Sequence, residues 1–337
     1  MQAIVQSAYG PPEQVLSLRE VETPETGEGE LLLRVKAASI HPDIWHVANG
    51  YPSVLRLMGA GLARPRQPIP GTDVAGVVES VGVGVTRFRP GDRVFGESIR
   101  GHQWKNGGAF AEFVAVPQDS LALIPEGISF EQAAAVVTSG LIALNNLRGE
   151  TAIRAGQNVL INGAAGGVGS IALQFAKASG ARVTGVDHSR KQEMMRRLGA
   201  DHVIDHTRED VLQGDARYDL IVDVASTLSH TDCKRILAPG GLYLVIGHDH
   251  YGTRSGRLMG SLPRFFLMML VSLFASHLPR PNFDLPSRQE LMPVLRDLLA
   301  REQLTPVIDR VYPLSETVDA LHYLESGETC GKIIVSP

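Results

Sequence analysis

The stretch that decides the fold is NVLINGAAGGVGSIALQFAKASGARVTGVD, residues 158–187. Its first five residues are those of a buried strand, a glycine-rich turn follows, and residues 169–179 have the apolar spacing of a helix. Residues 182–187 form a second strand-like run, which ends in Asp187. A strand, a tight turn, a helix and a second strand make up a βαβ unit, whose two strands lie parallel in one sheet.

The same alternation of helix and strand extends on both sides of this unit. We expect strands at residues 202–204, 218–224 and 241–247, and helices at residues 130–149, 190–198 and 231–237. Such alternation is typical of a parallel sheet that is covered by helices on both faces. Residues 126–270 are therefore predicted to form a doubly wound α/β domain.

The rest of the chain has a different texture. Short apolar runs are broken by glycine and proline, which predicts a small irregular β-barrel with strands at residues 3–6, 30–38, 73–81, 93–96 and 111–117. The tail returns to this texture, with a helix at 287–302, a strand at 307–312, a helix at 315–326 and a strand at 331–335. We predict a discontinuous domain, residues 1–125 and 271–337, into which the α/β domain is inserted.

The glycine-rich turn carries the sharpest functional motif. Gly163, Gly166 and Gly169 are spaced three apart, and Ala164 gives an alternative register in which Ala164, Gly166 and Gly169 match a dinucleotide fingerprint. Glycine lets the main chain approach a pyrophosphate, and the start of the helix offers unpaired N–H groups. The candidate coenzyme-binding residues are Gly163, Ala164, Ala165, Gly166, Gly167, Val168 and Gly169, with Ile246 and Gly247 where the strand at 241–247 ends.

The end of the second strand bears on the choice of coenzyme. Asp187 lies 21 residues beyond Gly166, where a carboxylate can accept hydrogen bonds from the adenosine ribose and repel a 2′-phosphate. This favours NAD(H) slightly. Arg190 and Lys191 follow within one turn and are either a cationic clamp for NADP(H) or a solvated helix face.

Composition excludes several classes of partner. The chain has 337 residues, a net charge of −4 and no cluster of basic residues, so nucleic acid is not an expected partner. Two cysteines, Cys233 and Cys330, are too few for a disulfide framework and fit a reducing compartment. The N-terminus has no pattern of a secretory signal, so a cytoplasmic location is expected.

The most apolar segment, FFLMMLVSLFA at residues 265–275, is 11 residues long and so falls short of the roughly 20 that span a bilayer. A buried helix is its first interpretation. A wall over an apolar substrate pocket and a dimer contact are the alternatives.

With these motifs in order, the whole chain resembles the zinc-free quinone oxidoreductase-like branch of the medium-chain dehydrogenase/reductase superfamily. The resemblance rests on the glycine turn and on the segments PIPGTDVAGVVESVG (68–82), RFRPGDRVFG (87–96), GAFAEFVAVP (108–117), LGADHVID (198–205) and residues 305–335. It implies a GroES-like catalytic domain wrapped around a Rossmann domain, with the substrate reduced in the cleft between them. A homodimer is expected.

Zinc is not expected. Members of the superfamily that bind catalytic zinc carry ligands at positions that here hold His41, Thr72 and a residue near Ala135. One imidazole, a threonine and an alanine do not supply the three protein ligands of a catalytic zinc site. The four-cysteine structural zinc loop is also missing, because residues 97–107 contain no cysteine.

Three candidate catalytic residues remain. The resemblance places His41 in the cleft, at a position that is commonly asparagine in the zinc-free branch. His41 can hydrogen-bond the substrate oxygen or donate a proton, or it is a packing substitution. Trp45 is either an aromatic wall for a flat substrate or a core residue, and Thr138 either lies beside the nicotinamide or is a buried or capping hydroxyl.

The sequence therefore predicts an NAD(P)H-dependent oxidoreductase that reduces quinones or the alkene bond of α,β-unsaturated carbonyls. Without a metal, the substrate must already be activated, which a quinone or an enone satisfies. Two alternatives stay open: a metal-free alcohol or ketone dehydrogenase, and a dinucleotide-binding protein with a structural or regulatory role.

Overall fold

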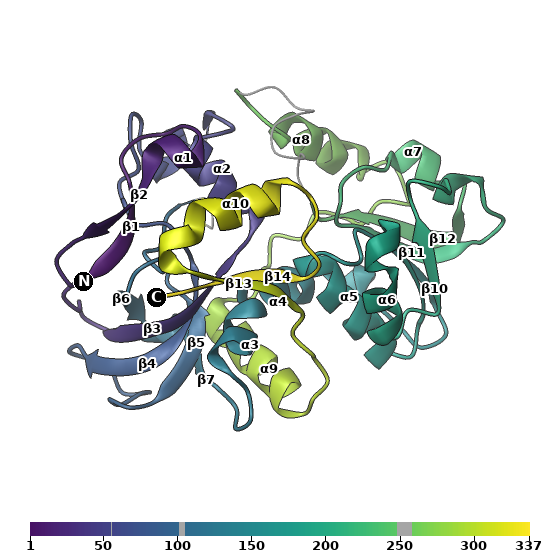
Figure 1. The fold of residues 1–337 in the computed structure, drawn as a ribbon. Helices are drawn as coiled ribbons and strands as arrows, with labels where there is room; N and C mark the ends of the chain where they lie inside the picture. Colours follow the sequence, from purple (N-terminus) through teal and green to yellow (C-terminus); the bar gives the residue numbers. More distant parts are fainter. Residues whose placement is uncertain (55, 101–104, 248–257) are drawn as a thin grey trace.

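The computed structural model describes residues 1–54, 56–100, 105–247 and 258–337. Its strands form two large sheets and one short hairpin. In Figure 1 the elements coloured purple, blue and yellow, from the two ends of the chain, lie on one side, and the teal and green strands lie on the other. The two ends of the sequence therefore build one lobe and the middle builds the second.

The second lobe is built on a parallel sheet of five strands in the order β10-β9-β8-β11-β12. The strands are β8 (Asn158–Asn162), β9 (Arg182–Asp187), β10 (His202–Asp205), β11 (Tyr218–Asp223) and β12 (Leu237–Val245). In chain order this is 3-2-1-4-5, so the direction of winding reverses between β8 and β11. The predicted doubly wound sheet is confirmed, and ligands of such sheets bind at the carboxyl ends beside this switch point.

The helices of this lobe are α5 (Gly167–Ala178), α6 (Gln192–Arg197) and α7 (His230–Cys233). Two of the predicted helices differ from the observed ones. The helix expected at 190–198 begins as a 3₁₀ turn, Ser189–Lys191, before α6. The helix expected at 231–237 is reduced to α7, because Leu237 already pairs with Tyr218 as the first residue of β12.

The first lobe contains a sheet of seven strands. They are β3 (Glu30–Ile40), β4 (Asp73–Val81), β5 (Arg93–Glu97), β6 (Phe113–Pro117), β7 (Leu121–Leu123), β13 (Ile308–Pro313) and β14 (Lys332–Ser336). β14 runs antiparallel to β3, with Ile334 opposite Ser39, so a strand from the tail completes a sheet that begins near residue 30. The discontinuous domain is confirmed, whereas the boundaries at 126 and 270 stay a prediction. β1 (Gln2–Gln6) and β2 (Leu16–Glu20) form the separate hairpin.

The remaining helices of the first lobe and the junction are α1 (Pro12–Val15), α2 (Pro42–Asn49), α3 (Phe130–Ala135), α4 (Val137–Asn146), α9 (Arg288–Ala300) and α10 (Thr317–Glu325). Capping boxes start two of them, Ser129 with Gln132 before α3 and Ser287 with Glu290 before α9. The single helix expected at 130–149 is interrupted at Val136 and becomes α3 and α4. α3 packs on β3 and β4 while α4 packs on α5, so the interruption lies where the two lobes meet.

The apolar segment at 265–275 corrects an expectation. It forms α8 (Leu262–Val271), and none of the residues of this helix is buried. Met268, Val271 and Ala275 pack against a core cluster around Tyr243, whereas Phe266, Leu270 and Phe274 are 58, 57 and 87% exposed. The interpretation as a buried helix is therefore wrong. Within the described parts of the chain, every helix is too short or too polar to cross a bilayer.

Candidate functional site

The turn between β8 and α5 is built around four glycines with different surroundings. Gly163 has a φ of +81°, and a Cβ placed there would lie 3.0 Å from the Ala225 nitrogen. A Cβ on Gly169 would lie 2.0 Å from the Gly163 oxygen, so this glycine allows the helix to pack on the turn. A Cβ on Gly166 would meet only the Gly163 oxygen, at 3.5 Å, among the described residues. The space above Gly166 is thus open, as an approaching pyrophosphate requires.

The other residues of the turn are divided between core and surface. Ala164 and Ala165 are fully buried, and Val168 packs against a core cluster at the junction of the lobes. Gly167 begins α5, and a Cβ there would lie 2.8 Å from Ser139 Oγ and 2.9 Å from Lys332 Cδ. Gly167 therefore makes room for side chains of the neighbouring helix and strand. The sequence analysis did not predict this role.

Asp187 lies at the carboxyl end of β9, as predicted, and is bound to the turn. Its carboxylate accepts hydrogen bonds from the backbone N–H of Ala165 (3.1 Å) and of His188 (2.9 Å). Lys191 Nζ lies 3.3 Å from the same carboxylate and donates to the Gly327 oxygen at 3.1 Å. Arg190 pairs with Glu328 at 2.9 Å. Arg190 and Lys191 thus join the second lobe to the loop after α10. They do not simply form a solvated helix face.

Ile246 and Gly247 follow β12 at the same edge of the sheet. Both backbone N–H groups donate to the backbone carbonyl oxygen of Asp223, at 3.0 and 3.4 Å. A Cβ on Gly247 would lie 1.8 Å from the backbone oxygen of Val224. Asp223 itself, which the sequence analysis missed, accepts hydrogen bonds from Asn162 Nδ2 (2.7 Å) and from the Tyr243 hydroxyl (2.9 Å). Burial raises the pKa of Tyr243, and the negative charge of Asp223 raises this pKa further. This buried carboxylate joins β8, β11 and β12 at the switch point.

His41 lies between the end of β3 and the start of α2. Its Nε2 is 2.7 Å from the Thr72 hydroxyl, and its Nδ1 is 3.5 Å from Asp43 Oδ2. The Thr72 hydroxyl lies 3.4 Å from Asp73 Oδ1, to which it donates. All four side chains are buried. The ring is therefore held by a hydrogen bond at Nε2, whereas Nδ1 lies near Asp43 without a hydrogen bond among the described residues.

Thr138 is also buried and polar in its contacts. Its hydroxyl lies between the carboxylates of Asp73 and Glu97, with 3.0 Å to Glu97 Oε1, and its backbone N–H donates to Asp73. Arg288 contacts Glu97. Thr138 thus joins α4 to the strands that carry Asp73 and Glu97, as a buried hydroxyl would. A contact of Thr138 with the nicotinamide stays a prediction.

Trp45 belongs to the core rather than to an exposed wall. It is 6% exposed and packs in the apolar cluster of the first lobe, and its ring meets that of His46 edge to face at a centroid distance of 5.3 Å. These contacts account for the residue as a core tryptophan.

Lys332 lies between the coenzyme turn and the buried acid Asp73, and the sequence analysis did not single it out. Its Nζ lies 3.7 Å from Asp73 Oδ2, and its aliphatic stem passes Gly167. The residue before it, Gly331, donates its N–H to the Ala165 oxygen at 2.8 Å. Burial lowers the pKa of Lys332, and the charge of Asp73 opposes that shift. A lysine at the start of the apolar run KIIV was the available signal, because buried lysines are rare unless paired.

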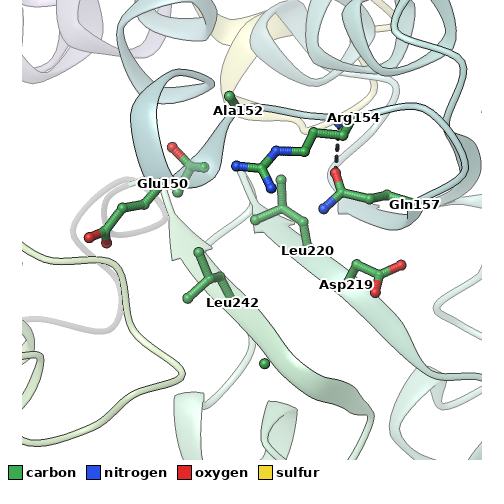
Figure 2. A pocket seen from close by; sticks show the side chains of 9 residues that line it. Glu150, Ala152, Arg154, Gln157, Asp219, Leu220 and Leu242 are labelled. Carbon is green, nitrogen blue, oxygen red and sulfur yellow. Dashed lines mark hydrogen bonds between the residues drawn. The ribbon is translucent and has the colours of Figure 1, made fainter.

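A separate polar pocket of about 120 Å³ lies at the other end of the parallel sheet. Figure 2 shows its lining, in which Arg154 donates its backbone N–H to Gln157 and Asp219 stands at the start of β11. Because ligands of doubly wound sheets bind at the carboxyl ends, this pocket at the amino ends is not a candidate coenzyme site.

The residues do not fit a catalytic zinc ion. Across the described ranges, no three side chains of His, Cys, Asp or Glu are grouped so that they could hold a metal. His41 Nε2 is engaged by Thr72, and threonine and alanine occupy the other two positions that carry ligands in zinc-dependent members. The turn after β8, in contrast, fits a dinucleotide.

Comparison with known proteins identifies the family. Residues 27–126 match the alcohol dehydrogenase GroES-like domain, and residues 198–335 match the zinc-binding dehydrogenase family. The chain is 31% identical to a quinone-oxidoreductase homolog of Spinacia oleracea, over 100% of this chain and 98% of that protein. It is 29% identical to an NADPH-dependent alkenal/one oxidoreductase of Arabidopsis thaliana, over 100% of this chain and 80% of the relative.

Among solved structures, Escherichia coli quinone oxidoreductase complexed with NADPH superposes with a TM-score of 0.79 at 27% identity, over the full length of both chains. The similarity thus covers both lobes and the order in which the chain builds them. The protein belongs to the quinone oxidoreductase-like branch of the medium-chain dehydrogenase/reductase superfamily.

Proposed function

We propose that the protein is an NAD(P)H-dependent reductase of quinones or of the alkene bond of α,β-unsaturated carbonyls. The observation that carries the proposal is an unbroken series of contacts between the coenzyme turn and His41. Lys332 reaches from Gly167 of the coenzyme turn to Asp73, and Asp73 is joined through Thr72 to His41. A coenzyme whose pyrophosphate is bound at the turn and a proton donor at His41 would then act on one substrate.

The residues of the chain have separate tasks in this reaction. The bound coenzyme supplies the hydride. Gly166 would leave room for its pyrophosphate, and the first N–H groups of α5 would offer donors to the phosphate oxygens. His41 supplies the proton after the hydride has been added, and the Thr72 hydroxyl contacts the developing enolate oxygen. Among the residues that the structure describes, no three His, Cys, Asp or Glu side chains are grouped to hold a metal, and an electrophilic substrate such as an enone or a quinone needs none.

The choice of coenzyme depends on the surroundings of Asp187. An isolated carboxylate there would repel a 2′-phosphate, but Lys191 neutralises it and two backbone N–H groups bind it. Solved and curated relatives bear names that specify NADPH. The proposed preference for NADH is therefore small, within about tenfold in kcat/KM.

A homodimer is proposed, with α8 at the interface. A run of large apolar side chains as exposed as Phe266, Leu270 and Phe274 is unusual on a monomer and typical of a contact surface. A cytoplasmic location is proposed as well, because both cysteines are free thiols, as a reducing compartment maintains them.

The test is turnover of a panel of quinones and enones with NADH and NADPH in parallel, before and after dialysis against a chelator. We expect reduction of several panel members and no loss of activity with the chelator. Activity that the chelator abolishes and zinc restores would contradict the metal-free mechanism. Oxidation of a saturated secondary alcohol with no turnover of the panel would indicate an alcohol dehydrogenase. Tight coenzyme binding with no hydride transfer would indicate a binding protein.

A further inference from the structure

We propose that Arg264, in the first turn of α8, is a positioning residue for coenzyme binding. It holds loop 224–228, which follows β11, in the conformation that receives the nicotinamide half of the coenzyme. The inference rests on the proposed function, in which a nicotinamide coenzyme supplies the hydride. It assigns a role to an exposed arginine that lies outside the glycine turn.

The position of loop 224–228 in the sheet indicates which half of the coenzyme it meets. β8 pairs with β9 on one side and with β11 on the other. Asp187, the predicted partner of the adenosine ribose, ends β9. A dinucleotide that crosses the switch point has its two halves on opposite sides of it, so the loop after β11 lies on the nicotinamide side. This loop also touches the coenzyme turn, because a Cβ on Gly163 would lie 3.0 Å from the Ala225 nitrogen.

Ser226, at the centre of this loop, has an unfavourable backbone conformation. Its φ is +55°, in the left-handed region that glycine adopts freely and serine does not. The residue is buried, and its Cβ lies 3.4 Å from the place that a Cβ on Gly247 would take. A non-glycine residue keeps such a conformation only where its surroundings hold it, and such residues cluster where ligands bind. The contacts of Ser226 therefore indicate what shapes the loop.

The residues on either side of Ser226 are held from the sheet. The Ala225 N–H donates to the backbone oxygen of Asn162 at 3.1 Å. The Leu228 N–H donates to Asp223 Oδ2 at 3.0 Å. These bonds fix where the loop leaves the sheet and where it returns, but they involve neither oxygen of Ser226.

Arg264 holds Ser226 itself. One guanidinium nitrogen, Nη1, donates to the Ser226 backbone oxygen at 3.0 Å and to its Oγ at 2.9 Å. The other, Nη2, donates to the Leu228 backbone oxygen at 3.1 Å. The rigid fork of a guanidinium can bridge two carbonyl groups in this way, whereas the single ammonium of a lysine is poorly suited to do so. The arginine is placed in turn by Met268 and Val271 of the same helix, which pack against the core cluster around Tyr243.

Arg264 would thus act on coenzyme affinity through the loop. Without the guanidinium, Ser226 can leave the left-handed region, and only a fraction of the molecules then has loop 224–228 in the binding conformation. The apparent Kd rises by the inverse of that fraction. The adenosine half lies on the other side of β8, so its binding should not change.

The binding experiment compares Arg264→Met with wild type by calorimetric titration of NADH, NADPH and ADP. Methionine removes the guanidinium and keeps an unbranched apolar stem, and ADP carries the adenosine and the pyrophosphate but no nicotinamide. We expect the Kd of NADH and of NADPH to rise about tenfold, and the Kd of ADP to stay within about twofold. Arg235→Met, at an exposed arginine just after α7 in the same lobe, is the matched control and should match wild type with all three ligands.

A rescue experiment separates the proposed role from a direct contact of Arg264 with the coenzyme. Ser226→Gly makes the left-handed conformation accessible without the guanidinium. We expect Ser226→Gly alone to bind NADH within about twofold of wild type, and the double variant Arg264→Met, Ser226→Gly to recover most of the affinity. Arg264→Lys keeps the charge but should still weaken NADH binding. In turnover, Arg264→Met should raise the KM for the coenzyme about tenfold and leave kcat within about twofold.

Three results would overturn the proposal while leaving the proposed function intact. The first is an unchanged Kd of NADH in Arg264→Met. The second is an equal loss of NADH and ADP binding, which would indicate a general disturbance of the lobe. The third is a double variant that binds NADH no better than Arg264→Met, which would indicate that Arg264 contacts the coenzyme directly. A wild type that binds neither NADH nor NADPH would contradict the proposed function instead.

Discussion

The glycines of the turn after β8 have different roles, although they are the same residue type. Gly163 adopts a left-handed conformation, Gly167 leaves space for Lys332, and Gly169 allows α5 to touch the turn. Of these turn glycines, Gly166 has the most open surroundings, because only the Gly163 oxygen among the described residues lies within 4 Å of an added Cβ. Substitutions in one motif should consequently separate coenzyme binding from folding.

We predict that Gly166→Val lowers coenzyme affinity at least 100-fold and leaves the Tm within about 2 °C of wild type, because its side chain fills the pyrophosphate approach and strains nothing else. Gly169→Ala serves as the comparison. Its Cβ would lie 2.0 Å from the Gly163 oxygen, so it should lower the Tm by several degrees. Calorimetric titration and thermal unfolding measure the two effects. Unchanged affinity in Gly166→Val would refute the assignment of the turn.

The second prediction at this scale concerns Asp187. We expect Asp187→Ser to move the ratio of kcat/KM toward NADPH by on the order of tenfold, or about 1.4 kcal/mol, since it removes a negative charge and frees Lys191 for the 2′-phosphate. Asp201→Ser is the matched control, because Asp201 pairs with Lys177 at 2.7 Å and binds the Val183 N–H near the start of β9. A ratio that shifts equally in both variants would show that the charge at Asp187 is not decisive.

The limits of sequence reasoning are clearest for His41. The family resemblance places it in the cleft, but its neighbour Asp43 lies only two residues away and was not recognised. The two side chains meet because His41 is extended at the helix N-cap and Asp43 is already helical, a change in backbone direction that periodicity does not specify. Lys332 was missed for another reason, since its partner Asp73 is distant in sequence.

At the scale of elements, regular periodicity predicted the parallel sheet well and the short connections poorly. The strands at 158–162 and 182–187 agree with β8 and β9 to the residue, because apolar runs between glycines leave little choice. The four-residue helix α1 and the strand β2 were not predicted, since such short segments carry no period. The apolar composition of α8 did not predict its exposure, because an apolar helix can be covered either by its own chain or by another chain.

The prediction at this scale tests α8 as a subunit contact. We expect the double variant Phe266→Ser, Phe274→Ser to convert the dimer to a monomer, because these rings are among the most exposed of the helix and its end. Light scattering after size exclusion measures the mass. Val83→Ser is the control, since Val83 is 81% exposed in the other lobe. A wild type that is already monomeric, or a double variant that remains dimeric, would exclude this surface.

At the scale of the whole molecule, the two lobes are joined by polar contacts in the core and at the surface. Lys332 pairs with Asp73 within the first lobe while its stem passes Gly167 of the second lobe, and Arg190 meets Glu328 at the surface between the lobes. Removing one member of a buried pair leaves an uncompensated charge, whereas exposed pairs contribute little. The buried pair of Lys332 and Asp73 should therefore contribute more to stability than the exposed pair of Arg190 and Glu328.

We predict that Lys332→Met lowers the free energy of unfolding by about 3–5 kcal/mol, because buried Asp73 loses its cation. Lys177→Met, which breaks a partly exposed pair with Asp201, should cost less than about 1 kcal/mol. Since burial lowers the pKa of Lys332 in the folded state, the unfolded chain binds more protons between that pKa and the ordinary value of 10.5. Wild-type stability therefore gains a component that rises with pH in this window, and Lys332→Met should lose it. Denaturant titration at several pH values measures both, and equal losses in the two variants would contradict the prediction.

The pairing of β14 with β3 has a consequence for synthesis on the ribosome. The five strands of the parallel sheet are all present once residue 245 has emerged, but the edge of β3 at residues 38–40 lacks its partner until residues 333–335 appear. At 5–20 residues per second, the intervening 90 or so residues take roughly 5–20 s. During that time the nascent chain exposes an open strand edge next to His41, which is where a chaperone would be needed. Lys332, which reaches Asp73 and passes Gly167 of the turn, takes its place only when this final strand docks.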